Sequence, residues 1–320
     1  MQKKIIIVLS LILCISCLST VQAADIIPLK IGAGSPGGTW FPMMTATMVI
    51  INKYVPGVIT SVVPGDAVSN VKNIDNNKFD LGLVYLSTAY EGRMGLPPFE
   101  KKHTNVMAIG NYPAGPYQYT VRADSEIKSI KDLYNKNIAV GSRGGGQDTN
   151  FQRILAKYGL SYESIEKAGG RLHFLSYDET KSMMKDRLID MGIFDAYPPD
   201  ANIVEIEMAF PCRVLNIDSE ILNDYLVENP GILGATVEKG VYKGQDEDVH
   251  TIAWAPLLAV SENMPEELVY QITRAIYENV KELSQGFKRL EMMTPETAVE
   301  GVPIPFHPGA QRYFEEKGVL

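Results

Sequence analysis

The stretch IGAGSPGGTW occupies residues 31–40 and has a counterpart, VGSRGGGQ, at residues 140–147. Both contain a Gly-Ser-x-Gly-Gly motif that follows an apolar, strand-like run and precedes a segment with helical periodicity. A glycine-rich turn between a strand and a helix exposes backbone N–H groups at the helix N-terminus, where the helix dipole favours an anion. Because the motif occurs twice, we expect two half-sites that face each other and hold one ligand.

Strand-like and helix-like segments alternate along both halves of the chain. In the first half, apolar runs at 28–34, 58–64 and 79–85 are separated by helical patterns, and a similar order restarts later in the chain. Strands that alternate with helices indicate βαβ units and a parallel sheet. Two long strand-like segments, PYQYTVRAD at 116–124 and TIAWAPLLAV at 251–260, fall where the chain would pass between the halves.

This pattern predicts an α/β protein of two lobes, joined by a two-strand hinge, with a ligand cleft between the lobes. The first lobe would comprise residues 24–118 and 256–320, and the second lobe residues 119–255. A single large doubly wound domain is the alternative that the pattern leaves open.

Residues 1–23 have the features of a secretory signal peptide. A basic start, MQKK, precedes the apolar run IIIVLSLILCISCLS, and VQA allows a cut after Ala23. The apolar run is shorter than the ~20 residues that span a bilayer. Cleavage before Cys17, as in a lipoprotein, is an alternative. We expect a periplasmic or otherwise extracytoplasmic protein.

Charge and cysteine content narrow the possible function classes. The chain has 30 basic and 38 acidic residues, and removal of Lys3 and Lys4 with the leader leaves 28 against 38, a net charge of −10. A nucleic-acid binder needs a basic face, so this composition argues against that class. Cys212 alone remains after the leader, so no intrachain disulfide is expected. We also expect no metal and no cofactor, since no metal-ligand motif is present.

The first glycine-rich loop also matches a dinucleotide-binding pattern. Gly32, Gly34 and Gly37 satisfy G-x-G-x-x-G, and Asp66 follows the second strand, where a ribose-binding acid could lie. However, Pro36 interrupts the fingerprint, and nicotinamide cofactors are scarce outside the cytoplasm. A further alternative is that either loop is a tight turn with no ligand.

The two loops resemble a hydrolase nucleophile elbow as well. Ser35 and Ser142 occupy equivalent places in the two motifs, and His173, His250 or His307 could serve as the base. One nucleophile needs only one elbow, so the duplication favours binding over catalysis. A secreted serine hydrolase that uses one of these two serines stays open as the alternative function.

Five blocks of sequence resemble, in order, the landmarks of TAXI-type solute receptors, the extracytoplasmic binding proteins of one class of TRAP transporters. The blocks are IGAGSPGGTWFPM (31–43), VPGDAVSNVKNI (63–74), FDLGLVYLSTAYEG (79–92), VGSRGGGQDTNFQRIL (140–155) and PIPFHPGAQRYFEEKG (303–318). The resemblance implies a type II periplasmic binding protein fold with the ligand between the lobes. It also implies delivery of a glutamate-like amino acid, a dicarboxylate or another small organic acid to a TRAP-type membrane permease.

Three loops depart from the pattern of that family. Gly65-Asp66-Ala67 replaces a Gly-Gly-Ser-like turn, Tyr85-Leu86 replaces a polar pair, and Arg143 precedes a glycine run where a Pro-Gly-Ser-Gly-Thr-like loop is usual. The resemblance therefore supports the scaffold more than it supports a particular substrate.

The candidate ligand-binding residues lie in the glycine-rich loops and at the carboxyl ends of the strands, the edge where open α/β sheets bind ligands. They are Ser35, Gly37, Gly38, Thr39, Trp40, Phe41, Asp66, Ala67, Tyr85, Ser87, Tyr90, Arg143, Gly144, Gly145, Gly146, Gln147, Tyr197 and Pro198. Arg143 could bind a ligand carboxylate through two parallel hydrogen bonds, and Asp66 could receive a ligand ammonium group. A ring of Trp40 or Phe41 would form an apolar wall. We expect an exported receptor for a small organic anion, with no catalytic residue.

Overall fold

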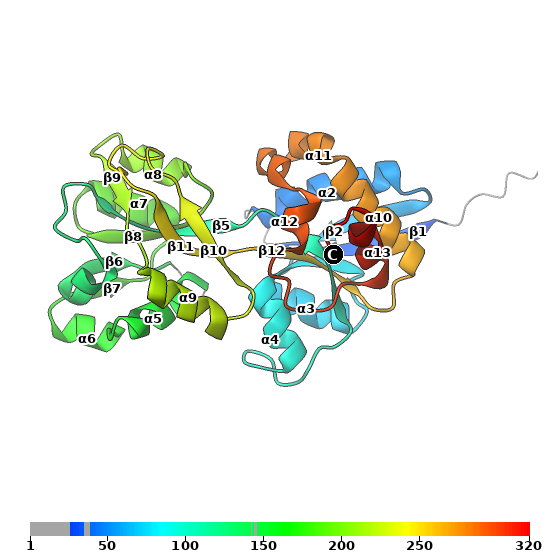
Figure 1. The fold of residues 1–320 in the computed structure, drawn as a ribbon, viewed down its shortest axis with the longest axis horizontal. Coiled ribbons are helices and arrows are strands. Elements are labelled where there is room, and N and C mark those ends of the chain that lie inside the picture. Colours follow the sequence, from blue (N-terminus) through cyan, green and yellow to red (C-terminus); the bar gives the residue numbers. More distant parts are fainter. Residues whose placement is uncertain (1–25, 35–38, 142, 144–145) are drawn as a thin grey trace, which may run out of the picture.

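The computed structural model describes residues 26–34, 39–141, 143 and 146–320, which form two lobes side by side along the long axis of the molecule (Figure 1). The expected signal peptide, residues 1–23, lies outside the described residues. Within the described ranges, no helix is both long enough and apolar enough to cross a membrane.

The first lobe is built on a mixed sheet with the strand order β2-β1-β3-β12-β4. Its strands are β1 (Ile27–Gly32), β2 (Val58–Val63), β3 (Leu81–Tyr85), β4 (Val106–Asn111) and β12 (Pro256–Ser261). β1 runs parallel to β2 and β3, whereas β12 runs antiparallel to β3 and β4. The parallel strands therefore end at the edge where β12 begins, and Pro256 lies beside Tyr85.

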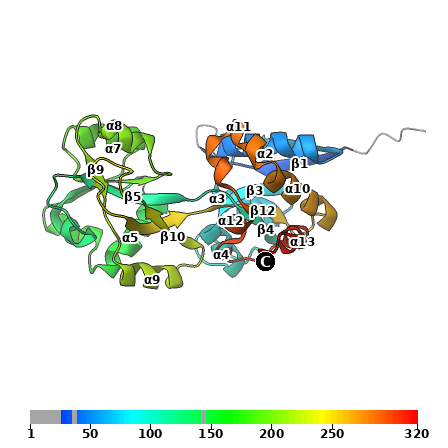
Figure 2. The same cartoon turned by 45° about the horizontal axis from the view of Figure 1, so that its top comes forward.

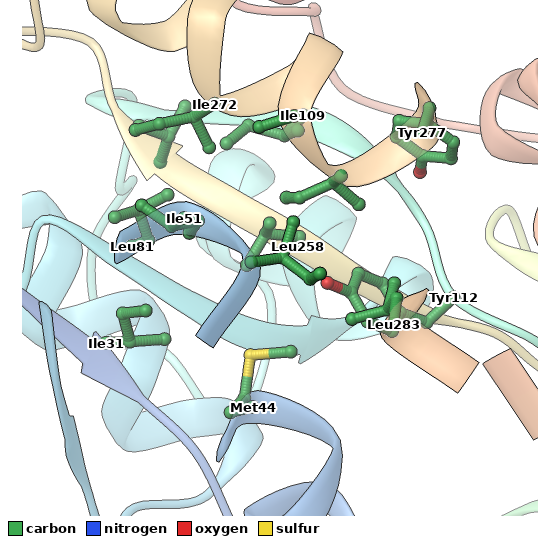
Figure 3. Packing of buried hydrophobic residues seen from close by; sticks show 14 of the residues in the cluster. Ile31, Met44, Ile51, Leu81, Ile109, Tyr112, Leu258, Ile272, Tyr277 and Leu283 are labelled. Carbon is green, nitrogen blue, oxygen red and sulfur yellow. The ribbon is translucent and has the colours of Figure 1, made fainter. Parts of the chain in front are cut away.

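Helices cover both faces of this sheet (Figure 2). They are α2 (Trp40–Tyr54), α3 (Ala67–Asp75), α4 (Leu86–Met94), α10 (Glu266–Glu278), α11 (Val280–Gly286), the short helix η2 (Lys288–Met292), α12 (Pro295–Val299) and α13 (Pro308–Glu316). On one face, Met44 of α2, Ile272 of α10 and Leu283 of α11 pack around Ile31 and Leu258 of the sheet (Figure 3). α3 and α4 pack on the opposite face. Burial of both faces explains why β3, β4 and β12 are almost continuously apolar, whereas β1 and β2 carry exposed residues.

The second lobe has its own mixed sheet, in the order β10-β11-β5-β8-β6-β7, with β9 paired to β5. Its elements are β5 (Gly115–Arg122), η1 (Ile130–Asn135), β6 (Asn137–Ala139), α5 (Gly146–Lys157), α6 (Tyr162–Lys167), β7 (Arg171–His173), α7 (Tyr177–Lys185), β8 (Met191–Asp195), α8 (Ala201–Ile206), β9 (Cys212–Val214), α9 (Ser219–Glu228), β10 (Ile232–Val237) and β11 (Val249–Trp254). Residues of α5, α6 and α9 form one core cluster with the sheet, and residues of α7 and α8 form another.

The chain passes between the lobes twice, from β4 to β5 and from β11 to β12 (Figure 1). The prediction of a two-lobed α/β fold is confirmed. The segment expected as one strand at 251–260 is interrupted at Ala255, because β11 pairs with the second sheet and β12 with the first. Helix α6 and strand β10 were not expected from the sequence.

Candidate ligand-binding site

In each lobe, the sheet edge at which β3 or β8 ends faces the other lobe. In the first lobe, β3 ends at Tyr85 and helix α4 begins at the next residue. In the second lobe, β8 ends at Asp195, which lies opposite Tyr117 near the start of β5. Since one residue, Ala255, connects β11 with β12, both edges lie at the passages between the lobes. Helices α2 and α5 also begin at these edges, at Trp40 and Gly146.

An aromatic cluster connects the two lobes at this place. The rings of Trp40 and Tyr85 lie 4.6 Å apart between centroids, and those of Tyr85 and Trp254 lie 4.3 Å apart. Trp254 in turn meets Tyr117 edge-on at 6.0 Å. The indole Nε1 of Trp254 is buried and has no hydrogen-bond partner among the described residues. A buried donor without a partner is costly, so this N–H is suited to an acceptor on a ligand.

A polar cluster adjoins the aromatic one in the second lobe. The Gln147 side-chain Nε2 donates to the Tyr177 hydroxyl at 2.7 Å and to Asp195 Oδ1 at 3.0 Å. The Tyr177 hydroxyl also bonds Asp195 Oδ1. Burial raises the pKa of Asp195 to about 7. Burial, together with the negative charge of Asp195, raises the pKa of Tyr85 well above its usual value. Tyr85 therefore presents a neutral hydroxyl at neutral pH.

Arg289 brings a positive charge to the same region, and the sequence analysis did not identify it. Its guanidinium carbon lies 5.6 Å from the centroid of the Tyr197 ring, so a side chain from η2 of the first lobe contacts the second lobe. Burial lowers the Arg289 pKa, while the charges of Asp200 and Asp195 raise it. Within the described part of the chain, no carboxylate lies within 4.0 Å of this guanidinium. No motif marks the segment, so only the fold reveals the residue.

The other first-lobe candidates have mixed surroundings. Thr39 occupies the N-cap position of α2 and is exposed, but its side chain makes no capping hydrogen bond. Phe41 is partly buried against the first-lobe core, as is Trp40. Ser87 is buried in α4, and Tyr90 is half-buried on the same helix.

Asp66 has a local structural role. Its carboxylate accepts hydrogen bonds from the backbone N–H groups of Val68 at 3.0 Å and Ser69 at 2.9 Å, and so caps helix α3, which starts at Ala67. The Ser69 hydroxyl completes the capping box by accepting the backbone N–H of Asp66. The carboxylate of Asp66 is thus already engaged at a helix N-terminus.

In the second lobe, the guanidinium of Arg143 stacks on the Phe174 ring, 3.7 Å from its centroid, and the residue is exposed. Gly146 begins α5 directly against the Trp254 ring, which leaves no room for a Cβ atom. Tyr197 and Pro198 follow β8 and line a cavity between the lobes. Six candidate residues from the glycine-rich loops lie outside the described residues: Ser35, Gly37, Gly38, Ser142, Gly144 and Gly145.

Comparison with known proteins places this chain among binding-protein folds. Residues 31–318 match the family model described as the NMT1-like family. A TctC solute-binding protein from Polaromonas is 16% identical, over 92% of this chain and 98% of that chain, with a TM-score of 0.58. XAC2383 from Xanthomonas citri, bound to ATP, is 13% identical over 91% and 96% of the two chains, with a TM-score of 0.51. PhnD1 from Prochlorococcus marinus, in complex with methylphosphonate, is 13% identical over 92% and 99%, with a TM-score of 0.50. These similarities support the same two-lobed fold.

Proposed function

The chain belongs to the NMT1-like family, and from that premise we propose that it is an exported receptor that captures a small organic anion between its two lobes. The observation that carries the proposal is the half-buried guanidinium of Arg289, which has no carboxylate within 4.0 Å among the described residues. A ligand carboxylate matches the planar pair of donors that such a guanidinium presents.

Two further features support an anionic ligand. The N-termini of α2 and α5 contribute partial positive charge at the facing sheet edges. The buried indole N–H of Trp254 offers a hydrogen-bond donor beside the Tyr85 ring. Two of the proteins with a similar fold were determined with the anions ATP and methylphosphonate, which agrees with this ligand class.

We further propose a glutamate-like amino acid or dicarboxylate as the ligand, and a TRAP-type permease as the partner that receives it. The resemblance to TAXI-type receptors supports both points. We expect the ligand to leave the protein chemically unchanged. Conversion of the ligand by the wild-type protein, lost on replacement of Ser35 or Ser142 by alanine, would instead support a hydrolase.

The first experiment is a thermal-shift screen with L-glutamate, 2-oxoglutarate, succinate and glucose. A ligand at one hundred times its dissociation constant stabilises a protein by ~2.7 kcal/mol, which such a screen detects. We expect stabilisation by one or more of the three acids and none by the sugar. Stabilisation by glucose alone would contradict the proposal.

Calorimetry on two arginine variants then locates the anion. Arg289→Ala should weaken binding of the acid by ~2–5 kcal/mol, because truncation leaves a buried carboxylate without its partner. Arg143→Ala is measured beside it: an exposed side chain on the rim contributes only ~0–1 kcal/mol, whereas the carboxylate contact expected from the sequence would cost ~2–5 kcal/mol. A larger loss from Arg143→Ala than from Arg289→Ala would reassign the anion to the second glycine-rich loop.

A further inference from the structure

Asp195 and Arg289 are two opposite charges of the candidate site that are not paired with each other. Asp195 ends β8 of the second lobe, whereas Arg289 belongs to η2 of the first lobe. The charge of each acts on the pKa of the other, but neither forms an ion pair with any side chain in the described part of the chain. Both residues are only partly buried, so a ligand between the lobes can reach them.

The Asp195 carboxyl group lies on the face of the second sheet that carries the aromatic cluster. Asp195 is directly opposite Tyr117 in the antiparallel pair of β8 and β5, so the two side chains project from the same face. The Tyr117 ring meets the Trp254 ring, which in turn meets Tyr85 of the first lobe. The charge of Asp195 also acts on the Tyr85 hydroxyl. The carboxyl group is therefore placed where side chains of both lobes meet.

The two oxygens of this carboxyl group have different surroundings. Oδ1 accepts hydrogen bonds from the Gln147 side chain at 3.0 Å and from the Tyr177 hydroxyl. Oδ2 bonds no other described residue and is not fully buried. Gln147 and Tyr177 are neutral donors, so they hold the carboxyl group in place but leave its negative charge without a cation. A largely buried carboxylate is stabilised most by an opposite charge, and here the ligand can supply it.

We propose that Asp195 determines the specificity of the receptor by binding a ligand ammonium group through Oδ2, while the Arg289 guanidinium binds the ligand carboxylate. The inference rests on the proposed function, because it concerns the same site and the same ligand. A zwitterion carries both charges, so it satisfies one unpaired group from each lobe at the same time. An acid of the same shape without an ammonium group leaves Asp195 uncompensated. The receptor should therefore prefer α-amino acids to plain dicarboxylates and 2-oxo acids.

Proton exchange provides a signature of this contact in the wild-type protein. The titratable and charged groups around Asp195 are Tyr85, Tyr117, Tyr177, Asp200 and Arg289. Because the pKa of Asp195 is about 7, roughly half of these carboxyl groups hold a proton at pH 7. An ammonium group beside the carboxylate lowers this pKa, so binding of an amino acid should release up to about half a proton per ligand. A plain dicarboxylate raises the pKa and should cause proton uptake instead.

The test compares L-glutamate, 2-oxoglutarate and glutarate, which differ at one carbon, by calorimetry on the full chain at pH 7. We expect L-glutamate to bind the wild type at least ~10-fold more tightly than the other two acids. In Asp195→Asn, this preference should fall to within ~2-fold, while the affinity for glutarate is retained or increases. The matched control is Asp186→Asn, which removes an exposed carboxylate at the end of α7 in the same lobe and should leave the preference intact. Wild-type titrations in two buffers of different ionisation enthalpy measure the protons released.

Binding of the three acids without a preference for L-glutamate would overturn this inference and leave the proposed function intact. A preference that survives in Asp195→Asn would also overturn it, and loss of that preference in Asp66→Asn would then assign the ammonium group to Asp66. Proton uptake when L-glutamate binds the wild type would contradict the contact whether or not the variant folds. Absence of binding by all three acids would instead contradict the proposed ligand class, and this inference with it.

Discussion

Asp195 is a largely buried carboxyl group at the edge of the second sheet, with Asp200 and Arg289 as the charged groups that act on it. Gln147 and Tyr177 donate hydrogen bonds to its Oδ1, but burial still raises its pKa to about 7 from an ordinary value of 3.8. Below about pH 4 the group is protonated in both the folded and unfolded states. Between about pH 4 and 7 the folded state holds a proton that the unfolded state has lost. The free energy of unfolding therefore decreases through this window as pH rises.

Asp195→Asn should remove this pH dependence. The amide oxygen can still accept both hydrogen bonds, and the buried charge is gone. We expect the variant to be more stable than the wild type at pH 8 by roughly 2–4 kcal/mol, and the difference to shrink toward pH 4. Urea unfolding of both proteins from pH 4 to 8 measures it. A difference that stays constant across the range would show that Asp195 is ionised throughout.

Arg143 and Arg289 illustrate what sequence reasoning can locate at the scale of one residue. Arg143 stands inside a recognisable glycine-rich motif and so was predicted to bind the ligand, a role that stays a prediction. Arg289 belongs to the five-residue helix η2, more than a hundred residues from either motif. Its contact with Tyr197 arises only when the last part of the chain returns to the first lobe.

The Asp66 carboxylate caps helix α3 and is also a candidate contact for a ligand ammonium group. Asp66→Ala should destabilise the protein by about 1 kcal/mol, because two backbone N–H groups lose their cap. Asp66→Asn retains a capping oxygen and should restore most of that stability. If Asp66 also binds a ligand ammonium group, Asn will keep the stability but lose ligand affinity, so unfolding and calorimetry together separate the roles.

Helix α5 begins with a glycine, Gly146, because the Trp254 ring leaves no space for a side chain there. Gly146→Ala would place a methyl group inside the Trp254 ring, so we expect a loss of about 1–3 kcal/mol, although alanine is the better helix former. Trp254→Ala is also expected to destabilise the protein. In the double variant Gly146→Ala/Trp254→Ala, the methyl group has space because the indole ring is gone. The destabilisation of the double variant should therefore be smaller than the sum of the two single losses. The double-mutant cycle should show a coupling energy of about 1 kcal/mol or more. Strict additivity in urea unfolding would contradict the contact.

Some elements were visible in the sequence and others were not, for physical reasons. α10 was expected because it has strong apolar periodicity and Pro265 at its start. β10 was missed because its sequence, ILGATV, lacks clear alternation of apolar and polar residues, although the turn-forming residues Asn229, Pro230 and Gly231 precede it. The break at Ala255 was missed because the residues on both sides are apolar, and the change of sheet is a property of pairing rather than of composition.

At the scale of the whole molecule, alternation of strands and helices was enough to predict two α/β lobes, because parallel strands need crossover helices to connect them. The lobe boundaries themselves stay a prediction, as does closure of the lobes around a ligand. We expect saturating ligand to reduce the radius of gyration in solution scattering, since only two chain passages join the sheets. An unchanged scattering curve with bound ligand would show that the lobes do not move.

The chain contains two tryptophans, and both contact the ring of Tyr85. One belongs to the first helix of the first lobe, and the other ends the last strand of the second lobe. The indole fluorescence of this protein therefore comes entirely from the place where the lobes meet. An emission change reports events at that place without any attached label, so the arrival of a ligand and the movement that follows it can be timed in the unmodified protein.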